Sequence, residues 1–171
     1  PAVIVRPFNN YGPGQHLEKL IPRFIASALS DEPLTVHGEG RAARDWVYVD
    51  DTCDTIERVL EVPIDVVRGE VFNVGTGVAT DVATIARRVL ALTGGSEELI
   101  QHGPDRPGQV DLHRAGVKKT AQRLGYRTTT ALDAGLERTV AWYRDHPERW
   151  RHQLWMRSVP VADPDGEITY W

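Results

Sequence analysis

Cysteine is nearly absent from the sequence, since Cys53 is the only one in 171 residues, and this excludes a disulfide within the chain. Cys53 and the six histidines show none of the short spacings, such as H-x-x-x-H or C-x-x-C, from which zinc sites are built. We therefore expect no metal site. Because no ligand-type residue neighbours it, Cys53 is expected to be inert.

Long hydrophobic runs and a basic excess are also missing. The apolar runs are far shorter than the roughly 20 residues of a membrane-spanning helix, and no leader-like segment precedes the first predicted strand. Lysine and arginine total 20 against 24 aspartates and glutamates, a net charge of -4, whereas nucleic-acid-binding domains are typically basic. We expect a cytoplasmic protein that binds neither membranes nor nucleic acid.

The hydrophobic content of 41% is enough for a packed core. Because the first residue is Pro1 rather than methionine, the sequence leaves open a fragment, a processed or split gene product, or a recombinant segment.

Residues 2–5 form a β-branched apolar run, which predicts a strand buried on both faces, as in a parallel sheet. Ligands of α/β sheets bind beyond the carboxyl ends of the strands. Asn9 and Asn10 would emerge there, before a turn that Gly12 shapes. The alternative is that both asparagines serve only the turn.

Helical and strand patterns alternate along the rest of the chain, which predicts an α/β fold. The helices are expected at 17–29, 50–62, 81–92, 117–124 and 130–146, and the short strands at 34–37, 45–49 and 71–74.

Three details of these predicted helices can be tested. Thr80 and Thr130 are expected to be N-caps. Ile56, Val59 and Leu60 are expected on one inward face.

Short motifs follow one another in a fixed order. They are Arg6-x-x-Asn9-x-Tyr-Gly-Pro13, Glu18-Lys-Leu-Ile-Pro22, Pro33-Leu-Thr-Val-His-Gly38, Arg44-Asp-Trp-Val-Tyr-Val49, Phe72-Asn-Val-Gly75 and Asp105-Arg-Pro-Gly108. Together they resemble the C-terminal half of extended short-chain dehydrogenases/reductases that act on nucleotide sugars. The resemblance covers roughly residues 2–150 and is strongest to the branch of dTDP-glucose 4,6-dehydratases and related epimerases.

The resemblance implies a fold and a reaction. Residues 1–150 would hold the C-terminal part of a Rossmann-type parallel sheet and a smaller mixed α/β substrate-binding domain, and 151–171 would be a tail of unknown role. The reaction would be oxidation at the sugar C4 by NAD, then elimination or epimerisation, then return of the hydride.

The family's Gly-rich loop and Tyr-x-x-x-Lys pair are expected upstream of the first strand. Tyr11 is no substitute, because Gln15 stands four positions later. The Gly75-Thr-Gly77 turn lacks a third glycine at the spacing of a dinucleotide loop, so we assign it a structural role. We therefore expect no catalytic residue in this chain and no NAD binding by the chain alone. The complete enzyme would need a missing N-terminal half or partner chain and is expected to be a homodimer.

The resemblance also implies a nucleotide-sugar site. Its residues would be Asn9, Lys19, Leu20, Val36, His37, Arg44, Asn73 and Arg106, with Pro7 and Phe8 near the nicotinamide. Arg44 and Arg106 would bind the diphosphate, because a guanidinium makes paired, charge-assisted bonds to phosphate oxygens. Val36 and His37 would line the base.

The chain departs from the dehydratase pattern at His37, where those enzymes usually carry tyrosine, and at Gln109, where histidine usually follows Pro-Gly. These departures leave the base and the sugar open. Structural alternatives are a salt bridge for Arg44, a solvated surface charge for Lys19 and backbone hydrogen bonding for Asn73. Two other functions remain open: a stand-alone nucleotide-sugar-binding or regulatory protein without catalysis, and an inactive truncated fragment.

Overall fold

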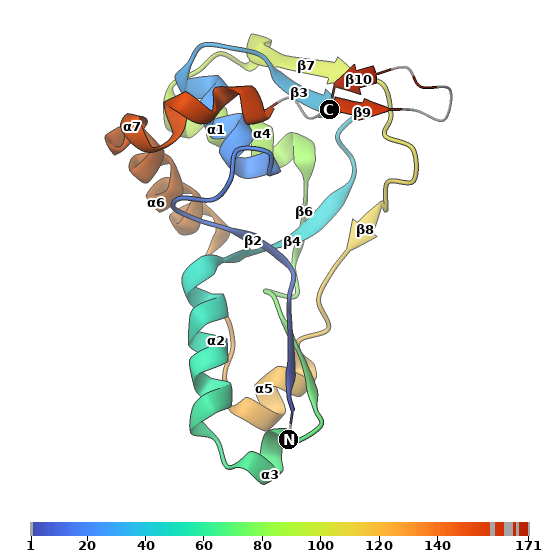
Figure 1. Cartoon of the computed structure of the whole chain (residues 1–171), viewed down its shortest axis with the longest axis vertical. Coiled ribbons are helices and arrows are strands. Elements are labelled where there is room, and N and C mark those ends of the chain that lie inside the picture. Colours follow the sequence, from blue (N-terminus) through green and yellow to red (C-terminus); the bar gives the residue numbers. More distant parts are fainter. Residues whose placement is uncertain (1, 158–159, 163–165, 167, 171) are drawn as a thin grey trace.

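The computed structural model describes residues 2–157, 160–162, 166 and 168–170. The molecule is elongated, with one group of elements at each end and a small sheet between them (Figure 1). Each end has its own hydrophobic cluster.

The lower part in Figure 1 is built on a two-stranded parallel sheet. Its elements are β1 (Ile4–Pro7), β5 (Val71–Val74), α2 (Val49–Glu61), α3 (Ile64–Val67) and α5 (Lys118–Leu124). Phe72 of β5 packs with Val59 of α2 and Leu124 of α5 in a small core. α5 ends at Gly125, whose φ of 64° lies in the left-handed region that favours glycine.

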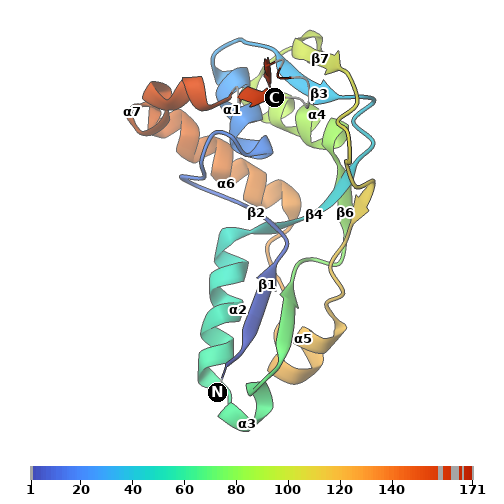
Figure 2. The same cartoon turned by 45° about the vertical axis from the view of Figure 1, so that its right-hand side comes forward.

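The predicted double burial of the first strand is wrong. Ile4 is 50% exposed and Arg6 is exposed, whereas Val5 packs against the small core. In the described part of the chain, β1 pairs only with β5, and Figure 2 shows β1 between β5 and α2. One paired edge and one covered face are too little to bury a strand, whatever its sequence.

The upper part holds three packed helices, α1 (Leu20–Leu29), α4 (Val82–Thr93) and α6 (Leu132–Asp145). The parallel pair of β3 (Leu34–His37) and β7 (Ile100–Gly103) covers one side. The remaining elements are η1 (Glu97–Leu99), α7 (Pro147–Trp150), η2 (Arg151–Arg157) and the hairpin of β9 (Pro160–Ala162) with β10 (Ile168–Tyr170). Phe24, Ile25 and Leu136 are fully buried in the larger core.

The middle sheet joins the two parts (Figure 1). β2 (Asn9–Tyr11) runs parallel to β4 (Ala43–Tyr48), and β4 pairs antiparallel with β6 (Ala79–Asp81). β8 (Leu112–His113) adds a short parallel pairing to β4. β4 is therefore the strand on which the connection between the two parts depends.

Helix details correct several predictions. α1 begins at Leu20, later than position 17, and Pro22 lies in its first turn. Asp81 rather than Thr80 caps α4, because its carboxylate accepts a hydrogen bond from Thr84 N at 2.7 Å. α6 follows Ala131 without a side-chain cap, so Thr130 is not its N-cap.

The face of α2 was also predicted wrongly. Val59 is buried, but Ile56 is 43% and Leu60 is 79% exposed. The buried side of the helix is largely polar, because the carboxylate of Asp51 accepts hydrogen bonds from the backbone N–H groups of Thr129 and Thr130. Apolar spacing alone therefore named the wrong side.

The segment after α7 packs back onto the upper part. Arg157 of η2 forms an ion pair with Glu32 and donates a hydrogen bond to Ser27 Oγ at 3.1 Å. Residues 158–159, 163–165, 167 and 171 of the predicted tail lie outside the described residues. None of the helices described has the length and hydropathy of a membrane span.

Candidate functional site

A cavity of about 410 Å³ lies where β2, the start of α1, β4 and the loop after β7 meet. Asn9, Lys19, Leu20, Arg44 and Arg106 all line it, so the structure brings together five of the eight residues predicted for the nucleotide-sugar site. The other lining residues are Asn10, Gln15, Ile21, Ala42, Trp46, Val82 and Gln109.

The cavity is electropositive. Lys19, Arg44 and Arg106 are its cations, and no aspartate or glutamate is among the described residues that line it. Lys19 is exposed and pairs with Glu18 next to it in the sequence, and this contact lowers the pKa of the Glu18 carboxyl. A water-accessible cavity with cations on several sides favours an anionic ligand.

Arg44 is held by its place on β4. Its Nη1 donates to the carbonyl of Ala43 at 2.9 Å, and no salt bridge to Arg44 occurs among the described residues. The predicted alternative of a structural ion pair therefore has no partner in this structure. The guanidinium keeps donors for a ligand.

Asp45, the next residue on β4, is fully buried and organises the turn after β5. Its carboxylate accepts hydrogen bonds from Thr76 N and Gly77 N, both at 2.8 Å, and from Ala115 N at 3.1 Å. The Thr76 hydroxyl adds a fourth at 2.8 Å. The Gly75-Thr-Gly77 turn thus has a structural role, and its N–H groups are already used.

The loop between β2 and α1 is fixed by the chain around it. The Gln15 side chain donates to the carbonyl of Asn10 at 2.7 Å, and the hydroxyl of Tyr143 on α6 donates to the carbonyl of Gln15. Asn10 Oδ1 accepts from the Thr52 hydroxyl at 2.7 Å. Gln15 therefore lines the cavity from a loop that these hydrogen bonds hold in place.

Several lining residues were missed from the sequence. Side chains alternate along a strand, so Trp46 shares the face of Arg44 on β4 and could have been named. Gln109 was noted only as a departure from the family pattern. No local signal in the sequence points to Gln15, because a long-range contact with Tyr143 sets its place.

A second cavity, also about 410 Å³, shares Ala42, Arg106 and Gln109 with the first. His37 lines this second cavity, and its Nδ1 lies 3.2 Å from the carbonyl oxygen of Pro104. Carboxylates are present here, from Glu39, Asp105 and Asp111. His37 is thus next to the electropositive cavity rather than inside it.

Val36 is not brought to either cavity. It is fully buried in the larger core, where it packs near Gly40. Along β3 the side chains of Leu34 and Val36 point inward while those of Thr35 and His37 point outward. Neighbours on one strand could not both have lined the base.

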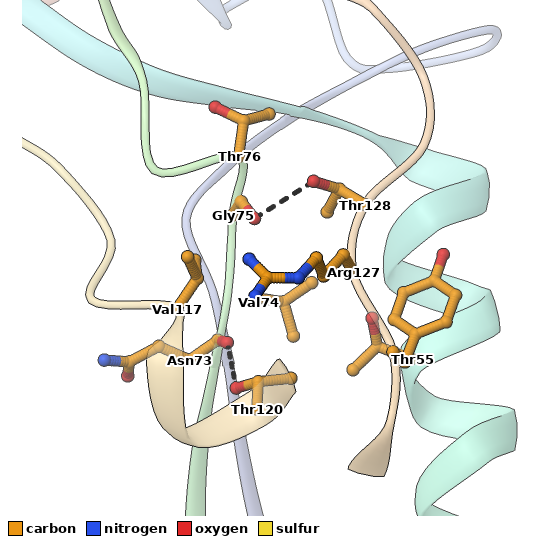
Figure 3. A pocket seen from close by; sticks show the side chains of 10 residues that line it. Thr55, Asn73, Val74, Gly75, Thr76, Val117, Thr120, Arg127 and Thr128 are labelled. Atoms are coloured by element: carbon orange, nitrogen blue, oxygen red, sulfur yellow. Dashed lines mark hydrogen bonds between the residues drawn. The ribbon is translucent and has the colours of Figure 1, made fainter. Parts of the chain in front are cut away.

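Asn73 lies at a separate, smaller cavity of about 100 Å³ between β5, α5 and the segment 126–128 (Figure 3). The Thr120 hydroxyl donates to the Asn73 carbonyl at 2.7 Å, and the Thr128 hydroxyl donates to the Gly75 carbonyl at 3.2 Å. Arg127 projects into this space (Figure 3). The hydroxyl protons of these threonines are therefore already used, and Asn73 is not brought to the electropositive cavity.

Pro7 and Phe8 lie at the end of β1 and line none of these cavities. The ring of Phe8 packs on His113 with 4.6 Å between ring centroids. In the part of the chain that the structure describes, no group of three or more histidine, cysteine, aspartate or glutamate residues is arranged to hold a metal ion.

Fold and cavity together define a Rossmann-type α/β chain with an electropositive ligand site. Residues 1–75 match the family model described as "NAD dependent epimerase/dehydratase family". Over 164 residues the chain is 34% identical to dTDP-glucose 4,6-dehydratase of Streptomyces niveus, covering 96% of this chain and 46% of that protein.

Solved structures of similar fold carry related names. DesIV, a dTDP-glucose 4,6-dehydratase from Streptomyces venezuelae with NAD and TYD bound, superposes with a TM-score of 0.80 at 35% identity, covering 87% of this chain and 45% of that one. UDP-glucose 4-epimerase from Thermotoga maritima with UDP-glucose gives 0.77 at 29% identity, covering 84% and 46%. Over most of its length the chain is therefore similar to proteins of the NAD dependent epimerase/dehydratase family, as the motif order indicated. It spans about half the length of the curated relatives it matches.

Proposed function

We propose that this chain is the nucleotide-sugar-binding part of a NAD-dependent sugar-nucleotide 4,6-dehydratase or epimerase. The observation that carries the proposal is the cavity in which Lys19, Arg44 and Arg106 converge with Asn9 and no carboxylate. Such a cavity suits the two phosphates of a nucleotide sugar, since paired guanidinium–phosphate bonds are strong and directional. Relatives bind such ligands: the Thermotoga maritima epimerase holds UDP-glucose.

The proposed division of labour follows from the residues. Arg44 and Arg106 hold the diphosphate, Asn9 orients the ligand beside it, and the adjoining cavity with His37 receives the base. Within the proposal this chain binds and positions the substrate. It supplies no proton-transfer group, because it has no Tyr-x-x-x-Lys pair.

NAD, when bound to a complete enzyme, takes up and returns a hydride. The Gly-rich turn after β5 does not fit the phosphates of the cofactor, because the N–H groups of Thr76 and Gly77 donate to Asp45 and a buried carboxylate there would repel phosphate. We propose that the cofactor and the catalytic pair come from a separate N-terminal half or partner chain.

The lower part of the molecule offers a place for that half. Among the described residues β1 has a single strand partner, and Ile4, Ile56, Leu60 and Ile64 are exposed on β1, α2 and α3. Exposed apolar side chains beside an unpaired strand edge typically mark an interaction surface. The isolated chain is therefore expected to self-associate, and to gain activity only when joined to the other half.

Calorimetric titration of the chain with dTDP-, UDP- and GDP-sugars, with and without NAD, tests this function. We expect nucleotide-sugar binding without turnover and no heat from NAD alone. Arg44→Ala and Arg106→Ala should each weaken binding by about 2 to 4 kcal/mol, the cost of breaking desolvated charge pairs, and lysine should restore only part of it. Arg68→Ala, at an exposed ion pair with Asp65, is the matched control.

Unchanged affinities of both alanine variants would remove the diphosphate assignment. Turnover by the chain joined to its other half would distinguish an enzyme part from a stand-alone binding or regulatory protein. A chain that binds no nucleotide sugar in either form would be an inactive fragment.

A further inference from the structure

Arg23, in the first turns of α1, is a cation without a counter-charge. Its Nε atom is shut off from solvent and has no hydrogen-bond partner, which is true of no other buried side-chain nitrogen or oxygen in the described part of the chain. The ion pairs found among those residues do not include it. A buried charge left in this way is costly.

The cost cannot be relieved by losing the proton. Burial, with the neighbouring charge of Arg106 as a second cause, lowers the pKa of the Arg23 guanidinium. Arginine nevertheless stays protonated at neutral pH, because its ordinary pKa is above about 12. Without a ligand, two guanidinium groups therefore repel one another at this place, one of them poorly solvated.

The position of Arg23 ties it to the electropositive cavity. It follows Lys19, which directly precedes α1, by four residues and Leu20, the first residue of the helix, by three, so Arg23 lies on the side of the helix that these two residues occupy. Arg23 itself is not among the residues that line the cavity. Lys19, Leu20 and Arg106 line the cavity. An anion bound there would supply Arg23 with a counter-charge that the described residues do not provide.

We propose that Arg23 is a further binding residue of this cavity and that it acts with Arg106 on one phosphate while Arg44 holds the other, which makes the site selective for ligands with two linked phosphates. This inference rests on the proposed function. It extends that function by naming a residue absent from the motif-based site and by stating what the extra charge distinguishes.

The test compares the wild-type chain with Arg23→Met, which keeps an unbranched apolar stem without the charge, and Arg23→Lys, which keeps the charge. The probes are dTDP-glucose and dTMP, titrated calorimetrically. We expect Arg23→Met to weaken dTDP-glucose binding about tenfold or more and dTMP binding by less than about threefold. Arg23→Lys should recover part of the loss. Arg149→Met, at an exposed site in α7, should change neither affinity.

The Tm of the ligand-free variants is a second readout. If Arg23 only stabilised the fold, its replacement would lower Tm, whereas the proposed binding role predicts an increase. Because the buried Nε of Arg23 has no hydrogen-bond partner and the side chain forms no ion pair among the described residues, Arg23→Met should raise Tm, by roughly 2 to 6 °C.

A lower Tm for Arg23→Met, equal losses for both ligands, or unchanged dTDP-glucose affinity would each overturn the role of Arg23 while leaving the proposed function standing. A wild-type chain that binds neither dTDP-glucose nor dTMP would overturn both.

Discussion

Replacement of Asp45 by asparagine tests the joint between the two parts of the molecule. The two side chains have nearly the same shape, so Asp45→Asn changes hydrogen-bonding capacity and charge with little change in packing. In the native chain one carboxylate oxygen accepts from the backbone and hydroxyl of Thr76, and the other accepts from Gly77 N and Ala115 N.

The magnitude follows from the number of donors left over. Asparagine can use its oxygen for only one of the two sets, and its own N–H₂ group then faces the donors of the other. Two donors lose their acceptor in either orientation, the N–H groups of Gly77 and Ala115 or the N–H and hydroxyl of Thr76, and each costs about 1 to 3 kcal/mol when buried. We expect the free energy of unfolding to fall by about 2 to 6 kcal/mol, a large share of the 5 to 15 kcal/mol typical of a domain.

Urea unfolding followed by circular dichroism measures this loss. Asp65→Asn is the matched control, because Asp65 is highly exposed and its only partner in the described chain is a 3.7 Å ion pair with Arg68. That variant should stay within about 0.5 kcal/mol of wild type. A loss below about 1 kcal/mol for Asp45→Asn would refute the argument, because it would mean that the turn finds other acceptors at no cost.

Two further predictions concern helix packing and capping. Gly135→Ala should destabilise the chain by about 1 to 3 kcal/mol despite the better helix propensity of alanine, because the new Cβ would lie 2.1 Å from the hydroxyl oxygen of buried Tyr11. Gly116→Ala is the control, because a Cβ at that position meets open space. Equal stabilities of the two variants in thermal unfolding would contradict the predicted clash. Partial burial raises the pKa of the Asp81 carboxyl, but the hydrogen bonds from Thr84 outweigh it and the pKa is lowered. A lowered folded-state pKa gives stability that is present above the unfolded value and lost as pH falls below about 4, so Asp81→Ala should cost about 1 kcal/mol at pH 7 and less at pH 3 in denaturant titrations; a cost independent of pH would show that the charge of the cap is irrelevant.

Elements whose bounds are set by neighbouring residues in the sequence were predictable. The strands Leu34–His37 and Val71–Val74 occur at the predicted bounds because short apolar runs between turn residues determine them locally. The burial of β1 was not predictable, because a strand is buried on both faces only where other elements cover it. The prediction of the buried face of α2 was wrong for a related reason. The Asp51 carboxylate accepts hydrogen bonds from a backbone segment far along the chain, and the spacing of Ile56 and Leu60 does not reveal this contact.

The residues of the candidate site likewise include some that the sequence predicted and some that it did not. Motif order located Arg44, Arg106 and Lys19, and the structure brings them together. It did not separate Val36 from His37, although strand alternation would have done so. Arg23 escaped notice because a helical pattern records which residues are apolar and says nothing of whether a charged one finds a partner.

Arg44 and Asp45 are consecutive residues of one strand, and their side chains leave β4 in opposite directions. The first faces the ligand cavity, while the second clamps the turn that connects the middle sheet to the lower part. β4 therefore contributes one residue to the ligand cavity and the next residue to the connection with the lower part. Binding in the cavity and the connection between the two ends of the molecule therefore depend on neighbouring residues of the same strand.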